Sequence, residues 1–185
     1  EAGILKGLYE LSHAGKAKRG AARVQLMGSG TILREVEHAA RVLAEEHGIA
    51  ADVWSVPSFS ELRRDALSVT RANRLHPGKK AKRSYLEQCF AGREGPFIAA
   101  TDYMCTVADQ VREWVPGRYV VLGTDGYGRS DGRAALRNHF EVDHRYIVVA
   151  ALSALAAEGR LEPAAVARAM KAYDIDPDKP DPVDL

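Results

Sequence analysis

The sequence has 185 residues, of which 46% are hydrophobic, and a formal net charge of +1. A chain of this length buries roughly 70% of the surface that its unfolded form exposes, so one ordinary domain is expected. The near-zero charge argues against nucleic acid or an anionic membrane as a partner, and the two cysteines are too few for a secreted disulfide scaffold. The composition therefore predicts a protein of the reducing cytoplasm. The first residue is Glu1 and no leader follows it, which suggests a fragment of something longer.

Apolar residues recur along the chain with strand and helix periods in alternation. The predicted strands are residues 3–11, as a short strand or extended arm, then 24–27, 52–56, 96–100, 119–122 and, briefly, 140–142. The predicted helices are residues 31–47, 58–73, 84–92, 101–115, 143–158 and 163–173. Strands that alternate with helices in this way predict a mostly parallel sheet with helices on both faces, in three layers.

Local signals support several helix boundaries. Ser58 and Ser84 each stand three residues before a glutamate, which is the capping-box pattern. Thr101 or Asp102 is expected to cap the next helix, whose predicted buried stripe is Met104, Val107, Ala108 and Val111. Residues 146–149 are β-branched enough for a strand, but the apolar pattern continues past ten residues and favours a helix. The predicted organisation is an N-terminal arm and linker at 1–23, one α/β domain at 24–173, and an extended acidic and Pro-rich tail at 174–185.

Two glycine-containing loops follow predicted strands, where parallel-sheet proteins bind ligands. The first is Gly28-Ser29-Gly30-Thr31. Its functional interpretation is an anion cradle at a helix N-terminus, with Ser29 and Thr31 beside the free amides. Its structural interpretation is a tight strand-to-helix turn. Leu33 stands where a dinucleotide-binding loop has its third glycine, and no Lys-Ser/Thr pair follows, so the turn is favoured and a P-loop is excluded.

The second loop, within residues 123–143, is chemically richer. Its polar candidates are Asp125, Arg129, Ser130, Asp131, Arg133 and His139. These groups suit a site for an anionic metabolite, since arginine forks bind carboxylate or phosphate. Alternatively, the acids and the serine cap turns, the arginines form ion pairs within the chain or with a second subunit, and the histidine closes a helix. The structural interpretation is favoured, because ion-pair networks produce the same residue types.

The other candidate residues do not have the spacing of a metal, nucleophile or nucleic-acid site. Cys89 and Cys105 are far from any pair of histidines, so no zinc site is predicted. Cys105 lies near the start of a predicted helix, which could lower the pKa of its thiol, but no histidine lies nearby in sequence to form a nucleophile pair. The favoured role of Cys105 is that of a small, buried apolar side chain. The basic segment 74–83 lacks interleaved aromatics, which argues against nucleic acid. Trp54 and Trp114 are expected in the core or at an interface.

Five runs cover most of the chain: VQLMGSGTILREVEHAARVLAEEHG, DVWSVPSFSELRRDA, ATDYM, VREWVPGRYVVLGTDGYGRSDGRAALRNHFEVD and YIVVAALSALAAEGRL. They resemble the C-terminal domain of the homodimeric, thiamine-diphosphate-dependent pyruvate dehydrogenases, the decarboxylating component of the bacterial pyruvate dehydrogenase complex. Two positions depart from the family pattern. Tyr127 stands where Phe is common, and Asn138 precedes His139 where many members have a second histidine.

The resemblance implies a transketolase C-terminal-like domain with a mixed five-stranded sheet that serves mainly in dimer contacts. In the full-length family enzymes, thiamine diphosphate and magnesium lie between two other domains, and the acetyl group passes to the acetyltransferase core of the complex. The family's cofactor motif begins Gly-Asp-Gly, whereas this chain has Thr124-Asp125-Gly126. We therefore expect a structural domain that holds no cofactor and is inactive alone. The alternative is a small-anion or effector-binding module that uses Arg129, Arg133 and His139.

Overall fold

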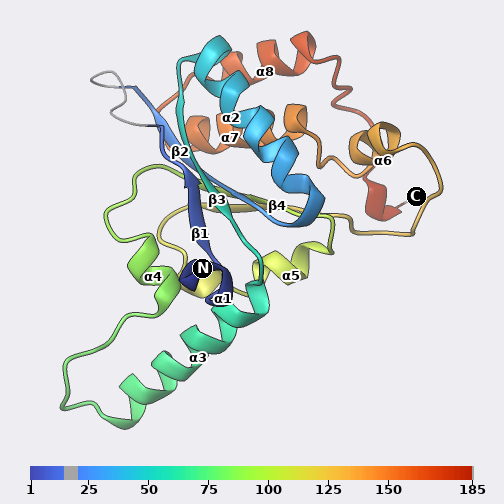
Figure 1. Ribbon diagram of the computed structural model, residues 1–185. Helices are drawn as coiled ribbons and strands as arrows, with labels where there is room; N and C mark the ends of the chain where they lie inside the picture. The colour runs from blue at the N-terminus through green and yellow to red at the C-terminus, as the bar shows by residue number, and fades with distance from the viewer. Residues whose placement is uncertain (15–20, 185) are drawn as a thin grey trace.

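The computed structural model describes residues 1–14 and 21–184, and in it five strands form one mixed sheet (Figure 1). The strands are β1 (Tyr9–Ser12), β2 (Arg23–Gly28), β3 (Ala50–Ser55), β4 (Phe97–Ala100) and β5 (Tyr119–Leu122). Their order across the sheet is β1-β3-β2-β4-β5. β1 runs antiparallel to β3, and the other neighbouring strands are parallel. The predicted α/β fold with a mostly parallel, mixed five-stranded sheet is confirmed.

Helices cover both faces of the sheet. They are α1 (Ala2–Leu5), α2 (Leu33–His47), α3 (Phe59–Leu75), α4 (Tyr85–Cys89), α5 (Cys105–Asp109), α6 (Arg133–His139), α7 (His144–Ala157) and α8 (Pro163–Ala172). Short 3-10 turns lie at Gly30–Ile32, Arg112–Trp114 and Pro182–Asp184. Figure 1 shows α2, α7 and α8 on one side of the sheet and α3, α4 and α5 on the other.

The two faces of the sheet bury different side chains. Because successive side chains of a strand point to opposite faces, Leu26 enters the core under α2 and α7, while Met27 enters the core under α3 and α4. The first core is aliphatic. The second contains the aromatic rings of Trp54, Phe90 and Phe97, with ring centroids 5.1 Å apart for the first two and 4.6 Å apart for the last two. Trp54 and Trp114 are both buried, as predicted.

Several predicted helix boundaries are confirmed by hydrogen bonds. Ser84 and Glu87 form a complete capping box at the start of α4. The Ser58 hydroxyl accepts a hydrogen bond from the backbone N–H of Glu61 at the start of α3. Asp143 caps α7, because its carboxylate accepts from the backbone of Arg145, and residues 146–149 are helical as expected. Gly48 ends α2 in the left-handed conformation, with φ of 65°.

Three predicted elements are wrong. Residues 3–11 do not form one strand, because Ala2–Leu5 is a helical turn and only Tyr9–Ser12 joins the sheet. The fourth predicted helix starts at Cys105, capped by neither Thr101 nor Asp102, and the preceding Met104 is 58% exposed instead of buried. Residues 140–142 form a turn, since Glu141 has φ of 60°, which is incompatible with an extended strand.

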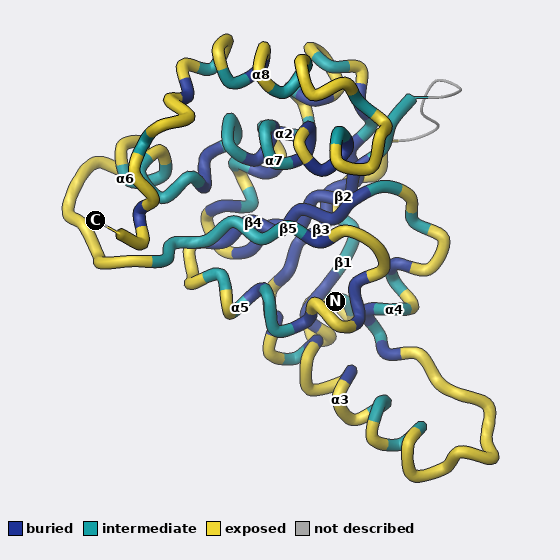
Figure 2. The backbone as a smooth tube through the Cα atoms, turned by 180° about the vertical axis from the view of Figure 1, so that it is seen from behind, coloured by how far each residue is buried: buried dark blue, intermediate teal, exposed yellow. Residues whose placement is uncertain are grey.

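Both terminal segments contact the rest of the fold. β1 lies at the sheet edge beside β3, although it precedes residue 24. After Tyr173 the chain is mostly exposed (Figure 2), but Ile175 and Pro182 are buried. The ammonium group of Lys179 donates hydrogen bonds to the carbonyl oxygens of Asn138 and His139, at 3.0 and 2.8 Å. The C-terminal segment therefore packs against the end of α6.

Candidate functional site

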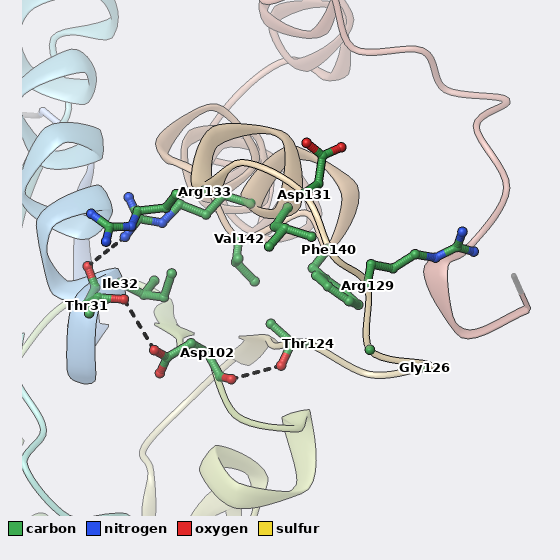
Figure 3. A pocket seen from close by; sticks show the side chains of 13 residues that line it. Thr31, Ile32, Asp102, Thr124, Gly126, Arg129, Asp131, Arg133, Phe140 and Val142 are labelled. Atoms are coloured by element: carbon green, nitrogen blue, oxygen red, sulfur yellow. Dashed lines mark hydrogen bonds between the residues drawn. The ribbon is translucent and has the colours of Figure 1, made fainter.

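A cavity of about 450 Å³ opens at the carboxyl end of the sheet (Figure 3). Its walls come from the loop after β2, the loop after β4, the loop after β5 and helix α6. β2 leads to α2 on one face of the sheet, whereas its neighbour β4 leads to α5 on the other. Loops that diverge from neighbouring parallel strands leave a crevice between them, which is the usual ligand position in open α/β sheets.

One end of the cavity has a network of hydrogen bonds that joins three loops. The Thr31 hydroxyl donates to Asp102 Oδ2 at 3.2 Å, and the Thr124 hydroxyl donates to the Asp102 carbonyl oxygen at 2.9 Å. Arg137 forms an ion pair with Glu35, with 2.6 Å between Nη1 and Oε1, and its Nη2 donates to the Thr31 carbonyl oxygen. Arg137 is thus committed to contacts within the chain.

The other arginines of the cavity are not committed in this way. Arg129 and Arg133 line the cavity, and neither forms an ion pair with any residue that the structure describes. Figure 3 shows that Arg129 points toward the C-terminal segment, while Arg133 extends across the cavity toward the Thr31 end. The apolar part of the lining consists of Ile32, Leu136, Phe140 and Val142. The cavity thus combines two guanidinium groups without an ion-pair partner among the described residues, the carboxylates of Asp102 and Asp131, and an apolar surface.

The residues predicted as a site are only partly brought together. Thr31, Arg129 and Arg133 line the cavity. Ser29 is 5% exposed, and its hydroxyl is hydrogen-bonded to the Thr101 hydroxyl at 2.7 Å. Asp125 accepts a hydrogen bond from the backbone N–H of Cys105 at 3.1 Å. Ser130 is exposed and is not part of the cavity lining.

His139 lies apart from the two arginines. It is the last residue of α6, the position that the structural interpretation gave it. Its ring packs edge-on against Phe140, with 4.8 Å between centroids, and its Nε2 is buried without a hydrogen-bond partner among the described residues. It does not line the cavity, so the predicted trio of Arg129, Arg133 and His139 is not assembled into one anion site.

Two glycines of the loop after β5 are needed because other parts of the chain approach them closely. A Cβ atom on Gly126, whose φ is 99°, would lie 2.4 Å from the carbonyl oxygen of Pro182. A Cβ atom on Gly123 would lie 2.7 Å from the backbone nitrogen of Cys105. In both cases the approaching group belongs to the chain itself, so these glycines shape the fold around the cavity.

A cluster of Glu35, His38 and His144, which was not predicted from the sequence, joins α2 to the start of α7. Glu35 Oε2 accepts hydrogen bonds from the backbone nitrogen and Nδ1 of His144, and the rings of His38 and His144 stack with centroids 3.8 Å apart and planes 21° apart. Only the i, i+3 spacing of Glu35 and His38 was visible in the sequence. Imidazole binds a metal in the plane of its ring, so two stacked rings do not aim their lone pairs at one ion. Burial, followed by His144 and Arg41, lowers the pKa of His38.

A second missed cluster surrounds Asp52 in the middle of β3. Its carboxylate is 1% exposed and receives hydrogen bonds from Arg23, the Gln25 side chain and the Ala14 backbone. His13 Nδ1 lies 2.9 Å from the same carboxylate. Burial acts to raise the pKa of Asp52, but the hydrogen bonds from Gln25, Ala14 and Arg23 outweigh it and hold that pKa below its usual value. This cluster is a structural ion-pair network.

Cys105 does not have the character of a nucleophile. Burial, together with its hydrogen bond to Asp125, raises the pKa of its thiol to about 12. A thiol with that pKa is protonated at neutral pH, and the thiolate is the reactive species. The structure therefore agrees that Cys105 is not a nucleophile, but its side chain is half-buried and not fully buried as predicted.

Comparison with known proteins gives the family. The transketolase-like TK C-terminal domain matches residues 7–143 of the chain. The chain belongs to this family. It is 60% identical over 185 residues to the pyruvate dehydrogenase E1 component of Pseudomonas aeruginosa, covering 100% of this chain and 21% of that protein. It is 48% identical over 183 residues to the E1 component of Escherichia coli K12, covering 98% of this chain and 20% of that protein.

Solved structures show the same fold. A transketolase from Campylobacter jejuni aligns with a TM-score of 0.53 and 21% identity, covering 80% of this chain and 18% of that chain. A split-gene transketolase aligns with a TM-score of 0.52 and 20% identity, covering 82% of this chain and 43% of that chain. The resemblance to the C-terminal domain of bacterial pyruvate dehydrogenases is thus confirmed, and the chain spans about a fifth of the length of its curated relatives. No helix in the described part of the chain is long and apolar enough to cross a membrane.

Proposed function

We propose that this chain is the C-terminal structural and contact domain of a pyruvate dehydrogenase E1 component. The observation that carries the proposal is the 60% identity to such a component over the whole chain. The full-length enzyme decarboxylates pyruvate with thiamine diphosphate and magnesium and transfers the acetyl group to lipoyl groups of the acetyltransferase core. It works in the cytoplasm as a homodimer, and this domain joins the other domains and the second subunit.

The residues present do not fit thiamine diphosphate or magnesium. Asp125, the acid of the near-miss Thr124-Asp125-Gly126 sequence, has its carboxylate bonded to the Cys105 backbone. The Thr124 hydroxyl is bonded to the Asp102 carbonyl oxygen. These two groups stabilise the loop conformation instead of offering oxygen ligands to a metal ion. The chemistry of the full-length enzyme is therefore assigned to other domains.

Exposed apolar side chains beside the cavity support a contact role. Tyr103, Met104, Tyr127 and Val183 are 59%, 58%, 80% and 55% exposed. Tyr127 belongs to the loop after β5, and the segments of Tyr103 and Val183 lie against that loop: the Thr124 backbone nitrogen donates to the Tyr103 carbonyl oxygen, and a Cβ atom on Gly126 would lie 3.3 Å from Val183 Cα. We call these four residues the apolar corner. Grouped large apolar side chains on a surface mark protein contacts, and aromatics and Met are enriched in them.

Two measurements test this proposal. Isothermal titration calorimetry with thiamine diphosphate and magnesium should give binding to the full-length protein but no heat with the 185-residue chain, whose folding circular dichroism verifies. Tight binding to the chain alone would refute the assignment of the cofactor to other domains. The full-length protein should release carbon dioxide from pyruvate only when both thiamine diphosphate and magnesium are present. Absence of that activity would refute the family assignment of function.

A further inference from the structure

We propose that the cavity at the carboxyl end of the sheet binds a small organic carboxylate with a short apolar body and a hydroxyl or ammonium group. Arg133 would hold the carboxylate, Asp102 would accept a hydrogen bond from the second polar group, and the apolar wall would cover the body. We call this cavity the carboxylate pocket. The proposal goes beyond the proposed function and does not depend on it, because it rests on the geometry of the cavity.

The position and size of the carboxylate pocket suit a small molecule. It lies where the loops after β2 and β4 diverge to opposite faces of the sheet, which is the ligand position of open α/β folds. Its volume of about 450 Å³ falls within the range of roughly 300 to 1,000 Å³ that is typical of ligand sites.

The charge that would recognise the ligand is Arg133. A guanidinium is always charged and presents paired N–H groups that match the two oxygens of a carboxylate. Arg137, one turn later on α6, already has this kind of partner in Glu35. Arg133 has no ion-pair partner among the residues that the structure describes, and it extends across the pocket (Figure 3). Arg137 thus has a carboxylate partner within the chain, whereas Arg133 faces the pocket.

The other residues that line the pocket determine which groups the ligand should carry besides its carboxylate. Asp102 accepts from Thr31 through Oδ2, and in the described part of the chain no donor bonds to its Oδ1. A ligand hydroxyl or ammonium group would satisfy that oxygen. Ile32, Leu136, Phe140 and Val142 offer no polar side-chain atoms, so they match an apolar body. A bare inorganic anion would leave this wall uncovered and would lie near the charge of Asp102, so an organic carboxylate is the better match.

The test uses 2-hydroxyisocaproate, which carries a carboxylate, a hydroxyl and a branched apolar body. Calorimetric titration into the full-length protein should detect binding. Arg133→Met should weaken it at least about tenfold, since it removes a charge-assisted contact. The matched control Arg63→Met changes an exposed arginine of α3, across the sheet, and should bind like the unmodified protein. Asp102→Asn should reduce the preference for 2-hydroxyisocaproate over isocaproate, which lacks the hydroxyl.

Several results would overturn the proposal. One is the absence of binding to the full-length protein. Another is equal weakening by Arg133→Met and Arg63→Met, and a third is equal binding of the uncharged 2-hydroxyisocaproamide. Binding to the 185-residue chain but not to the full-length protein would also overturn it, because another part of the protein would then fill the pocket. The pyruvate assay is independent of this titration. A negative result for carboxylate binding is therefore distinguishable from a negative result for the proposed function.

Discussion

The ion-pair network around Asp52 lies on strand β3 of the sheet, whereas the carboxylate pocket around Arg133 lies beyond the carboxyl ends of the strands. The two regions differ in whether their charged groups have partners within the chain. Around Asp52, a carboxylate that is 1% exposed receives donors from Arg23, Gln25 and Ala14. In the carboxylate pocket, Arg133 faces an open cavity and has no ion-pair partner among the described residues. The number of charges near a site therefore says little about its role, whereas their state of pairing separates structural charges from charges available to a ligand.

The largest expected effect comes from breaking the Asp52 network. Asp52→Ala removes the buried carboxylate that accepts hydrogen bonds from Arg23 and Gln25, and loss of one partner of a buried pair costs about 3–5 kcal/mol. Urea unfolding should show this as a lower free energy of unfolding. The control Asp109→Ala removes a solvent-exposed pair with Arg112 and should cost less than about 1 kcal/mol. Similar losses in both variants would refute the contrast between buried and exposed charges.

The same carboxylate predicts a loss of stability in acid. Because the folded state lowers the pKa of Asp52 below 3.8, the unfolded state binds a proton more readily, and the stabilisation is lost as pH falls through the folded pKa. The free energy of unfolding should fall below about pH 4 more steeply in the unmodified protein than in Asp52→Asn. Parallel pH profiles would show that Asp52 contributes no such linkage.

A smaller effect is expected at the glycine loop beside the pocket. Gly126→Ala places a Cβ atom against the Pro182 carbonyl oxygen at a left-handed φ, which costs about 1–3 kcal/mol. The C-terminal segment should detach from the loop after β5 before the rest of the domain unfolds. Faster hydrogen exchange at Val183 and Asp184 should report this detachment. Gly128→Ala is the matched control, because among the described residues, its two chain neighbours apart, no heavy atom lies within 4 Å of its Cβ position. Unchanged exchange in Gly126→Ala would mean that the loop does not hold the C-terminal segment.

The smallest effect should come from His38. The folded state lowers its pKa from 6.5, so the unfolded state binds more protons below that pH, and stability should decrease as pH falls from about 7.5 to 5.5. His38→Gln should flatten this part of the profile. An unchanged slope would remove His38 from the explanation of the pH dependence.

The parts of the fold that follow from local pattern were predictable. Alternating apolar periods gave the strands and most helices, and Ser84 with Glu87 marked a helix start because a capping box is a local interaction. The wrong predictions concern positions where tertiary contacts or an unusual backbone conformation determine the local structure. Met104 fitted a helical stripe but precedes α5 and is exposed, and Glu141 in the left-handed region interrupts what read as a strand.

The candidate site was predictable only in part. Arg129, Arg133 and Thr31 were named from loops after predicted strands, since such loops meet at one edge of a parallel sheet. Asp102, which bonds to Thr31 across the pocket, was read as a helix cap. The clusters around Glu35 and Asp52 join residues more than 25 positions apart, such as Arg23 with Asp52 and Glu35 with His144, and no sequence period indicates such contacts.

The central claim is that this domain acts through contacts made at its apolar corner. Full-length protein carrying Met104→Glu and Tyr127→Glu together should be compared with the exposed control Ala164→Glu on α8, by analytical ultracentrifugation and by pyruvate decarboxylation. The account predicts weaker dimerisation or reduced activity in the double variant and no change in the control. A double variant with unchanged dimerisation and unchanged activity would contradict it.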